Sequence, residues 1–341
     1  YDPSEFHYYD FFGKITATGA TGLKVSGAVD ANGDPATRII NVEPQISKKL
    51  VRGLFVFAGC DDLTLENLSL TYGPIHGTSG LVTDLGPDWV EVDIFEGLPR
   101  FDKMPTYCAN AWGMETRRLR NDINSLTFGK SPSYWRTIEG GEGRRVRIDG
   151  VRYASMLQKG DGISWWFSLR TFQLTTAACK DVHIENVRIG NVPGFGLNTF
   201  NCTNVYGNKV VFKSDTAHFP VTPRDAWKLA WNDGNVLIEN SHIEGVRWDG
   251  QNTHCPWFIV TERVDDKTAK FKKEGGKISI LKKGSEIGFW HQDKLVKRKI
   301  ADWTYEGAIP DEKRRRIHIM RITFDEAVPD FVAKDTRSTV Y

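Results

Sequence analysis

Two aspartates in the second half of the chain have a spacing that suits carbohydrate chemistry. The interval from Asp225 to Asp249 falls within the roughly 20 to 29 residues of one coil in a strand solenoid. Tryptophans lie close to both, with Trp231 after the first and Trp248 before the second. Glycoside hydrolysis uses two carboxyl groups: one protonates the leaving oxygen, and the other activates water or attacks carbon. Two neighbouring carboxylates would also keep one proton near neutral pH, because their repulsion opposes the ionisation of both. The two aspartates are therefore the candidate catalytic residues.

The side chains around the aspartates are suited to binding a sugar. A tryptophan offers a flat apolar face and one hydrogen-bond donor, and the segment 247–254 concentrates side chains that can hydrogen-bond hydroxyls. The candidate substrate-binding residues are Trp231, Lys228, Arg247, Trp248, Gln251, Asn252, His254 and Asp161. Asp161 is also a candidate third acid, although its Gly-Asp-Gly setting is typical of a turn. His254 fits a structural role equally well.

The elements that would position these residues form an internal repeat. Leu63–Leu70, Val182–Ile189 and Val236–Ile243 each alternate apolar and polar residues around a central Glu-Asn pair. Val205–Phe212 is a weaker copy, and Val146–Arg152 is interpreted as another. Alternation is the period of a strand with one buried face. Each copy is too short to bury that face alone, so the copies must stack on one another.

The spacing of the copies predicts the architecture. Val182 and Val205 are 23 residues apart, and Val205 and Val236 are 31 apart, close to the roughly 20 to 29 residues of a strand solenoid coil. Asn tolerates a left-handed bend, and stacked Asn side chains can hydrogen-bond to one another. The sequence therefore predicts an all-β protein with a right-handed parallel β-helix, and a β-sandwich is the alternative. Strands one coil apart are roughly 4.8 Å apart, which would bring Asp225 and Asp249 together.

Two stretches interrupt the repeat. Residues 77–97 contain an alternating run at 90–94 after a Gly-Pro-Asp turn at 86–88, which predicts a β-hairpin inserted between coils. Residues 257–326 contain alternating runs at 258–260, 277–281 and 316–320 without the Glu-Asn signature. They predict an antiparallel β-barrel or a small sheet.

These features divide the chain into three predicted parts. They are a parallel β-helix with its hairpin over residues 1–256, a barrel-like insertion over 257–326, and a return to the helix or a tail over 327–341. Residues 261–321 hold 17 Lys or Arg against 10 Asp or Glu. Such a basic surface either attracts acidic polysaccharide or protects exposed strand edges from pairing.

The composition excludes several classes of protein. The 341 residues include 45 Lys or Arg and 43 Asp or Glu, a balance that argues against a nucleic-acid partner. With 40% hydrophobic residues the chain is not generally disordered, and no apolar run approaches the length of a membrane span. Five cysteines without CxxC spacing argue against a disulfide framework and a structural zinc site. The chain opens at Tyr1 without a leader sequence, which indicates a mature or trimmed product.

Several segments resemble one known family. Arg224–Leu229, Asn235–Asn240 and Trp248–His254 are similar to the Asp-Ala-(Ile)-His, Gly-Val-Ile-Glu-Asn and Asp-Asp-Ala-Ile-Asn-Val-His motifs of glycoside hydrolase family 110. Upstream, Tyr72–Gly80 resembles the family's Asp-Tyr-(x)-Pro…Gln-Gly turn, and Pro193–Gly196 resembles its mid-helix coil. The family consists of α-1,3-galactosidases built on a parallel β-helix with inserted barrel modules.

The resemblance covers residues 55–330 in the order of elements and implies a function. It implies exo-acting, inverting hydrolysis of a terminal α-linked galactose, on galactose-containing glycans or sulfated galactans, without a metal or other cofactor. It places Asp225 at the first catalytic carboxylate position and Asp249 at the last. We expect Asp225 to be the acid and Asp249 the base, an assignment that stays open, with carboxyl groups roughly 6.5–9.5 Å apart for inversion. This chain departs from the family where Trp248 replaces the first Asp of an Asp-Asp pair and Lys228 replaces a His.

The resemblance also bears on partners and location. It implies an oligosaccharide or polysaccharide substrate and a secreted or periplasmic location, while the composition argues against nucleic acid and a membrane span. The exact sugar, its linkage and the formation of a homo-oligomer stay open, since many solenoids associate.

Two other functions fit the same residues. A polysaccharide lyase or epimerase needs a base near carbon 5 and a cation beside the uronate, and Lys228 and Arg247 could supply them. A β-helix that binds glycans without turnover would use the same tryptophans for stacking, because fold alone does not determine function.

Overall fold

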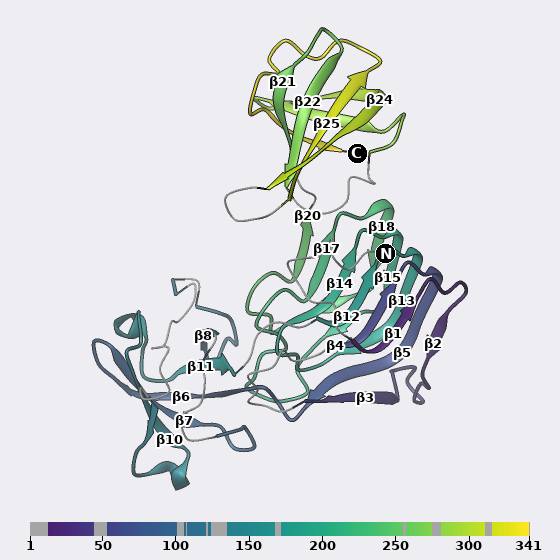
Figure 1. Cartoon of the computed structure of the whole chain (residues 1–341). Coiled ribbons are helices and arrows are strands. Elements are labelled where there is room, and N and C mark those ends of the chain that lie inside the picture. Colours follow the sequence, from purple (N-terminus) through teal and green to yellow (C-terminus); the bar gives the residue numbers. More distant parts are fainter. Residues whose placement is uncertain are drawn as a thin grey trace. The chain divides into compact units, whose positions relative to one another are not determined.

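The computed structural model describes residues 13–43, 53–100, 106, 108–120, 122–123, 135–167, 172–254, 257–274, 281–310 and 316–340. Their regular secondary structure is almost wholly β-strand and contains no α-helix (Figure 1). The chain divides into two compact units, one that runs to Thr253 and one that starts at His254.

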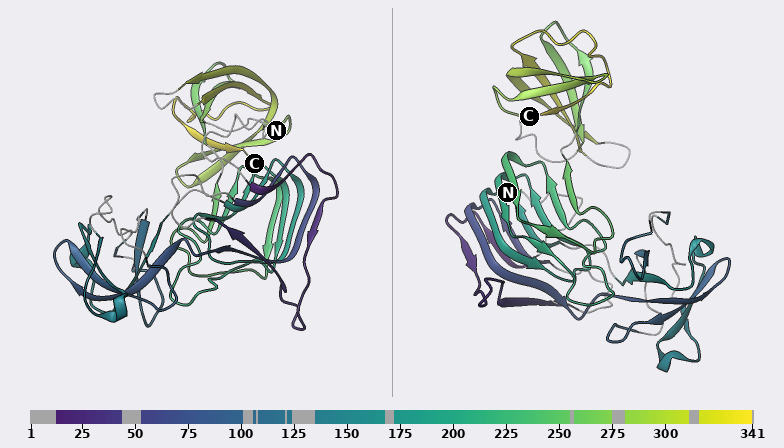
Figure 2. Two further views of the ribbon diagram at one scale, coloured as in Figure 1. Left: turned by 60° about the horizontal axis from the view of Figure 1, so that its bottom comes forward. Right: turned by 180° about the vertical axis from the view of Figure 1, so that it is seen from behind.

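Two parallel sheets form the larger part of the first unit (Figures 1 and 2). The first sheet has the order β1 (Gly13–Thr18), β4 (Gly53–Ala58), β12 (Phe172–Ala177), β14 (Phe195–Phe200), β17 (Trp227–Ala230) and β20 (Gln251–His254). The second contains β2 (Lys24–Ser26), β3 (Thr37–Val42), β5 (Asp61–Gly73), β13 (Lys180–Ile189), β15 (Thr203–Asn208), β16 (Val211–Phe212), β18 (Asp233–Glu239) and β19 (His242–Ile243). The chain alternates between the sheets, because β4 is followed by β5, β12 by β13, β14 by β15 and β17 by β18.

The Glu-Asn repeat is confirmed as a set of neighbouring parallel strands. Glu66 of β5 pairs with Glu185 of β13, which pairs in turn with Asn208 of β15. Asn208 pairs with Glu239 of β18. The apolar positions of the repeat are therefore in register. Those of β5, β13 and β15 form one continuous hydrophobic core with the first sheet, whereas Val236 in β18 is 43% exposed.

The bend expected at the central Asn is also confirmed. Asn67, Asn186 and Asn240 have φ angles of 57°, 50° and 48°, in the left-handed region that Asn tolerates better than most residues. Asn186 Nδ2 donates to Asn67 Oδ1 at 2.8 Å, and Asn240 Nδ2 donates to Asn208 Oδ1 at 2.9 Å. These amides link strands that are far apart in sequence.

A six-stranded antiparallel sheet follows β5 in the same unit. Its order is β8 (Cys108–Gly113), β11 (Asp161–Trp166), β6 (Gly77–Leu85), β7 (Trp89–Ile94), β10 (Arg145–Asp149) and β9 (Trp135–Thr137). The hairpin predicted at 77–97 is confirmed as β6 and β7.

The interpretation of Val146–Arg152 as a copy of the repeat is wrong. It begins in β10, which pairs antiparallel with β7 and β9. The alternation of β10 arises because Val146 and Ile148 are buried in the core of the antiparallel sheet. Alternation records one buried face and carries no information about the direction of the neighbouring strand.

The second unit contains the closed antiparallel barrel that the sequence predicts. Its strands are β21 (Phe258–Arg263), β22 (Thr268–Glu274), β25 (Arg316–Phe324), β24 (Lys294–Pro310), β23 (Glu286–His291) and β26 (Arg337–Val340). β26 pairs with both β21 and β23, so barrel strands continue past residue 326 and leave no open edge. The run at 277–281 lies, except for Leu281, outside the described residues.

The cysteines of the first unit carry free thiols. Cys60, Cys179 and Cys202 are buried, and Cys108 is partly exposed. Each of the three buried cysteines comes shortly after the end of a strand of the first parallel sheet, so they occupy equivalent positions in the core. Cys255 lies outside the described residues.

Candidate active site

Asp225 and Asp249 lie on neighbouring turns of the parallel stack, just before β17 and β20. The Ala226 N–H donates to the Asp249 carbonyl at 3.0 Å, and the Trp227 N–H donates to the Gly250 carbonyl at 3.1 Å. Trp227 is 1% exposed and packs in the core, which fixes the position of β17. The interval of one coil thus places the two aspartates beside adjacent strands.

One amide joins the two carboxyl groups. Asn252 Nδ2 donates to Asp225 Oδ2 and to Asp249 Oδ2, at 2.9 Å in both cases. Because both bonds start from one nitrogen, the two Oδ2 atoms are separated by no more than twice 2.9 Å. Asn252 therefore holds the carboxyl groups close enough to act on one substrate bond.

The two carboxyl groups occupy different environments. Asp225 is 4% exposed, whereas Asp249 is exposed. Burial raises the pKa of Asp225, and the charge of Asp249 raises it further. The charges of Lys228 and Arg224 and the hydrogen bond from Asn252 oppose this rise in the pKa. Asp225 consequently keeps its proton to a higher pH than an ordinary aspartate.

Cations and aromatic rings surround the carboxyl pair. The guanidinium carbon of Arg224 lies 3.9 Å from the ring centre of Trp248, and that of Arg247 lies 5.8 Å from it. Lys228 Nζ lies 5.6 Å from the ring centre of Phe195. Desolvation lowers the pKa of Lys228, and the charge of Asp225 counters that effect. The site therefore combines acidic groups, positive charge and an exposed indole.

Arg247 also ties the site to the antiparallel sheet. Its Nε donates to the carbonyl of Ala109 in β8 at 3.2 Å. Burial lowers the pKa of Arg247, yet a guanidinium remains charged in proteins. The segment that carries Trp248 and Asp249 is thus anchored from outside the parallel sheets.

Two of the residues proposed from the sequence, Trp231 and His254, lie toward the other end of β17 and β20, whereas Gln251 is the first residue of β20 and bonds within that strand. Trp231 follows the far end of β17 and packs on Phe200 at 4.5 Å between ring centres. Gln251 is exposed and donates to Thr253 Oγ1 at 3.3 Å. His254 is exposed at the end of β20 and belongs to the second compact unit. The cluster around the two aspartates is therefore smaller than the sequence suggested.

Asp161 has a structural role in the antiparallel sheet. Its Oδ2 accepts a hydrogen bond from Arg120 Nη1 at 2.7 Å and another from the Gln158 N–H at 2.8 Å. This carboxylate is buried, paired and placed at the start of β11. The turn interpretation of its Gly-Asp-Gly sequence fits this arrangement better than a role as a third acid.

Arg224 and Phe195 are site residues that the sequence did not reveal. Arg224 directly precedes Asp225, so proximity in the chain was a usable signal. Phe195 lies well upstream, at the start of β14, and reaches the site because the Gly196 N–H donates to the Asp225 carbonyl at 3.2 Å. That pairing depends on strand register, which a local pattern does not specify.

Within the described ranges, no three His, Cys, Asp or Glu side chains gather as a metal site would require. No helix in the described part of the chain is long and apolar enough to span a membrane.

In comparisons with known proteins, no family model matches the chain and no curated protein matches it.

Proposed function

We propose that this protein is a glycoside hydrolase that acts on galactose-containing glycans, with Asp225 as the general acid and Asp249 as its partner carboxylate. The observation that carries the proposal is the Asn252 amide shared by one buried and one exposed carboxyl group. Glycosidases assign different roles to two carboxyl groups by giving them different environments. The raised pKa of Asp225 suits an acid that must be protonated before it reacts.

We further propose that the two parallel sheets form a right-handed parallel β-helix. The alternation of the chain between the sheets supports this fold, and so do the Asn bonds between successive strands. Parallel strands joined by crossovers are almost always connected in the right-handed sense. In this fold the turns before β17 and β20 would carry the catalytic pair.

The distance between the carboxyl groups bears on the stereochemistry. Inversion, which the resemblance to family 110 implies, needs roughly 6.5–9.5 Å between them so that water fits, whereas retention needs about 5–5.5 Å. The upper limit of twice 2.9 Å for the Oδ2 pair lies closer to the second range. The product anomer, rather than this one pair of oxygens, therefore distinguishes inversion from direct attack by Asp249.

In the reaction as proposed, Asp225 gives its proton to the glycosidic oxygen while the bond to the anomeric carbon breaks. Asp249 then either forms a bond to that carbon, to be hydrolysed afterwards, or takes a proton from an attacking water. Trp248, 52% exposed, would stack on the sugar. Arg224 and Arg247 would favour a sulfated or acidic glycan by charge. A secreted or periplasmic location would fit such a substrate.

The test is galactose release from a panel of α-linked galacto-oligosaccharides, with and without sulfate. Asp225→Asn and Asp249→Asn should each reduce turnover by at least ~10²-fold, the scale expected for loss of a general acid or base. The anomer that NMR detects first in the product distinguishes retention from inversion. Near-normal rates in either variant would contradict the assignment, and binding without turnover by the unmodified protein would favour a glycan-binding protein.

One observation favours a second candidate, a lyase or epimerase that acts on uronates. The pKa of Lys228 is lowered by desolvation, and a lysine with a lowered pKa can act as a general base at carbon 5. Incubation with a polyuronate separates the candidates, because a lyase yields an unsaturated product that absorbs ultraviolet light. Such a product, lost in Lys228→Met, would replace the hydrolase proposal.

A further inference from the structure

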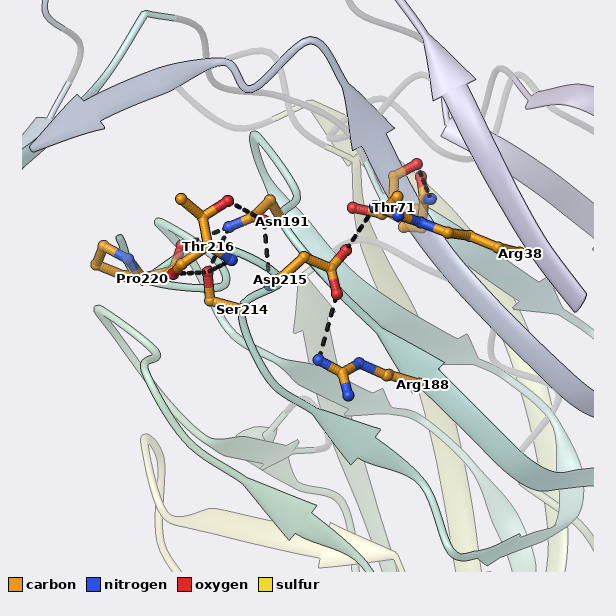
Figure 3. Close-up of polar contacts among 9 residues, drawn as sticks. Arg38, Thr71, Arg188, Asn191, Ser214, Asp215, Thr216 and Pro220 are labelled. Carbon is orange, nitrogen blue, oxygen red and sulfur yellow. Dashed lines mark hydrogen bonds and ion pairs between the residues drawn. The ribbon is translucent and has the colours of Figure 1, made fainter. Parts of the chain in front are cut away.

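A single buried amide organises the loop after β16. Asn191, 3% exposed, donates from Nδ2 to Ser214 Oγ at 2.7 Å. Its Oδ1 accepts bonds from the Asp215 N–H at 3.3 Å and from Thr216 Oγ1 at 3.4 Å. Figure 3 shows Asn191 beside Ser214 and Thr216. The loop therefore has a defined shape, set by a side chain one turn earlier in the stack.

This loop forms one wall of a cavity of about 760 Å³ within the first unit. The opposite wall comes from β8 and the residues that follow it. The lining side chains used below are Asn110, Trp112, Arg117, Arg118, His218 and Glu244. The volume lies in the range of small-molecule sites, about 300–1,000 Å³.

The wall of the cavity includes a buried amide without a partner. Asn110 is 2% exposed, and in the described part of the chain neither its Oδ1 nor its Nδ2 has a hydrogen-bond partner. A native structure rarely leaves both atoms of a buried amide unsatisfied. A sugar hydroxyl both donates and accepts, so it can satisfy such an amide.

His218 adds a second unsatisfied group. Its ring stacks on Phe95 at 4.5 Å and lies within 9° of parallel to Trp112. Its Nδ1 is buried and has no hydrogen-bond partner among the described residues. Burial lowers the pKa of His218, and the charge of Arg117 lowers it further, so the ring is neutral and can exchange a hydrogen bond with a hydroxyl.

The acidic groups near the cavity are already neutralised. Asp215 lies between Arg38 and Arg188, 3.3 Å from one guanidinium nitrogen of each (Figure 3). Glu244 contacts Lys213 Nζ at 3.3 Å and His242 Nε2 at 3.0 Å. The ion pairs of these two carboxylates therefore leave no net negative charge at the cavity from Asp215 and Glu244.

The positive charge at the cavity comes from two exposed arginines. Arg117 and Arg118 line the cavity, and over the described ranges neither forms an ion pair with an acidic side chain. A guanidinium binds a sulfate or carboxylate through two parallel hydrogen bonds. The cavity thus offers unpaired donors for an anion next to unsatisfied groups for hydroxyls.

We propose that this cavity binds an acidic sugar, with its hydroxyls at Asn110 and His218 and its sulfate or carboxylate at Arg117 and Arg118. None of these residues belongs to the Asp225–Asp249 pair, so the proposal does not rest on the catalytic one. The cavity is a binding site in its own right for an anionic glycan unit.

The test is calorimetric titration of the full chain with galactose 4-sulfate, galacturonic acid, galactose and inorganic sulfate. The two acidic sugars should bind at least about tenfold more tightly than galactose or sulfate, because only they engage both halves of the site. The double variant R117Q/R118Q, whose changes are exposed, should lose at least about tenfold in affinity for acidic sugars, the scale of hydrogen bonds to charged groups. Asn110→Ala should weaken galactose 4-sulfate more than inorganic sulfate.

Two controls separate binding at this cavity from binding elsewhere on the protein. Arg152→Gln removes an exposed arginine of the same unit outside the cavity and should leave binding unchanged. The loss of affinity caused by R117Q/R118Q should be the same in an Asp225→Asn background, because changes at separate sites add, so failure of either proposal can be recognised separately. Equal binding of inorganic sulfate and acidic sugars, unaltered affinity in R117Q/R118Q, or no binding of acidic sugars at millimolar concentration would overturn the proposal.

Discussion

The guanidinium carbon of Arg224 lies 3.9 Å from the centre of the Trp248 ring. This is well inside the range of a cation–π contact, which contributes about 0.5–2 kcal/mol depending on solvent exposure. Arg224 Nε is buried and, among the described residues, has no hydrogen-bond partner, so the ring is an important contact of this side chain. Trp248 is nevertheless 52% exposed, which leaves indole surface available to a ligand.

We expect Trp248→Ala to raise KM for the glycan substrate by about tenfold or more, since it removes both the stacking surface and the support of Arg224. Trp248→Phe should lie between Trp248→Ala and the unmodified protein, because a smaller ring keeps part of both contacts. Steady-state galactose release measures the effect. Trp290→Ala is the matched control, as Trp290 is 51% exposed on the second unit; an equal change in both variants would contradict a specific role for Trp248.

Lys228→Met should move the basic limb of the pH–activity profile to higher pH. The positive charge of Lys228 lowers the pKa of Asp225, so its removal lets burial and Asp249 raise that pKa further. A general acid works while it is protonated, and activity would therefore persist to higher pH. The measurement is kcat/KM against pH, with Lys294→Met, an exposed lysine of the second unit, as the control. A basic limb that stays in place or moves to lower pH would show that Asp225 is not the acid.

The repeat was predictable because its signals are local. Asn67, Asn186 and Asn240 mark left-handed bends, and the residue type alone records that preference. The alternation before each Asn likewise records which face is buried. These two patterns sufficed to place Glu66 and Glu185 in one parallel sheet.

The contacts that complete the sites are not local. Asn110 and His218 meet at one cavity although a large part of the first unit separates them in the sequence, and no pattern in either segment refers to the other. The segment that begins at Val146 shows why strand direction could not be predicted either. Its alternation of apolar and polar residues fits a parallel or an antiparallel neighbour equally well. Strand direction and register follow from the packing of the whole unit.

We expect Asn186→Ala to lower the free energy of unfolding by about 2–3 kcal/mol, through lost hydrogen bonds and backbone strain. Asn186 donates to Asn67 Oδ1 at 2.8 Å and to the Gly33 carbonyl at 2.9 Å, and each such bond contributes about 0.5–1.5 kcal/mol. Alanine would also carry the strain of a left-handed φ, whereas glycine would not. Asn186→Gly should therefore be less destabilising by about 1 kcal/mol in urea denaturation. Equal losses in the two variants would show that the bend imposes no strain.

His76 should make the protein less stable as the pH falls below neutrality. Burial lowers the pKa of His76 to about 4, while a histidine in the unfolded chain has a pKa near 6.5. Between these values the unfolded chain binds a proton that the folded chain does not, so the free energy of unfolding falls as the pH falls through this window. The difference amounts to about 3 kcal/mol at its full extent.

His76→Gln removes the titration, and its free energy of unfolding should decline less than that of the unmodified protein between about pH 7 and 4.5. His242→Gln, which alters an exposed histidine paired with Glu244, is the control. If His76→Gln has the same pH dependence as the unmodified protein, the buried ring is not the group that limits stability in acid.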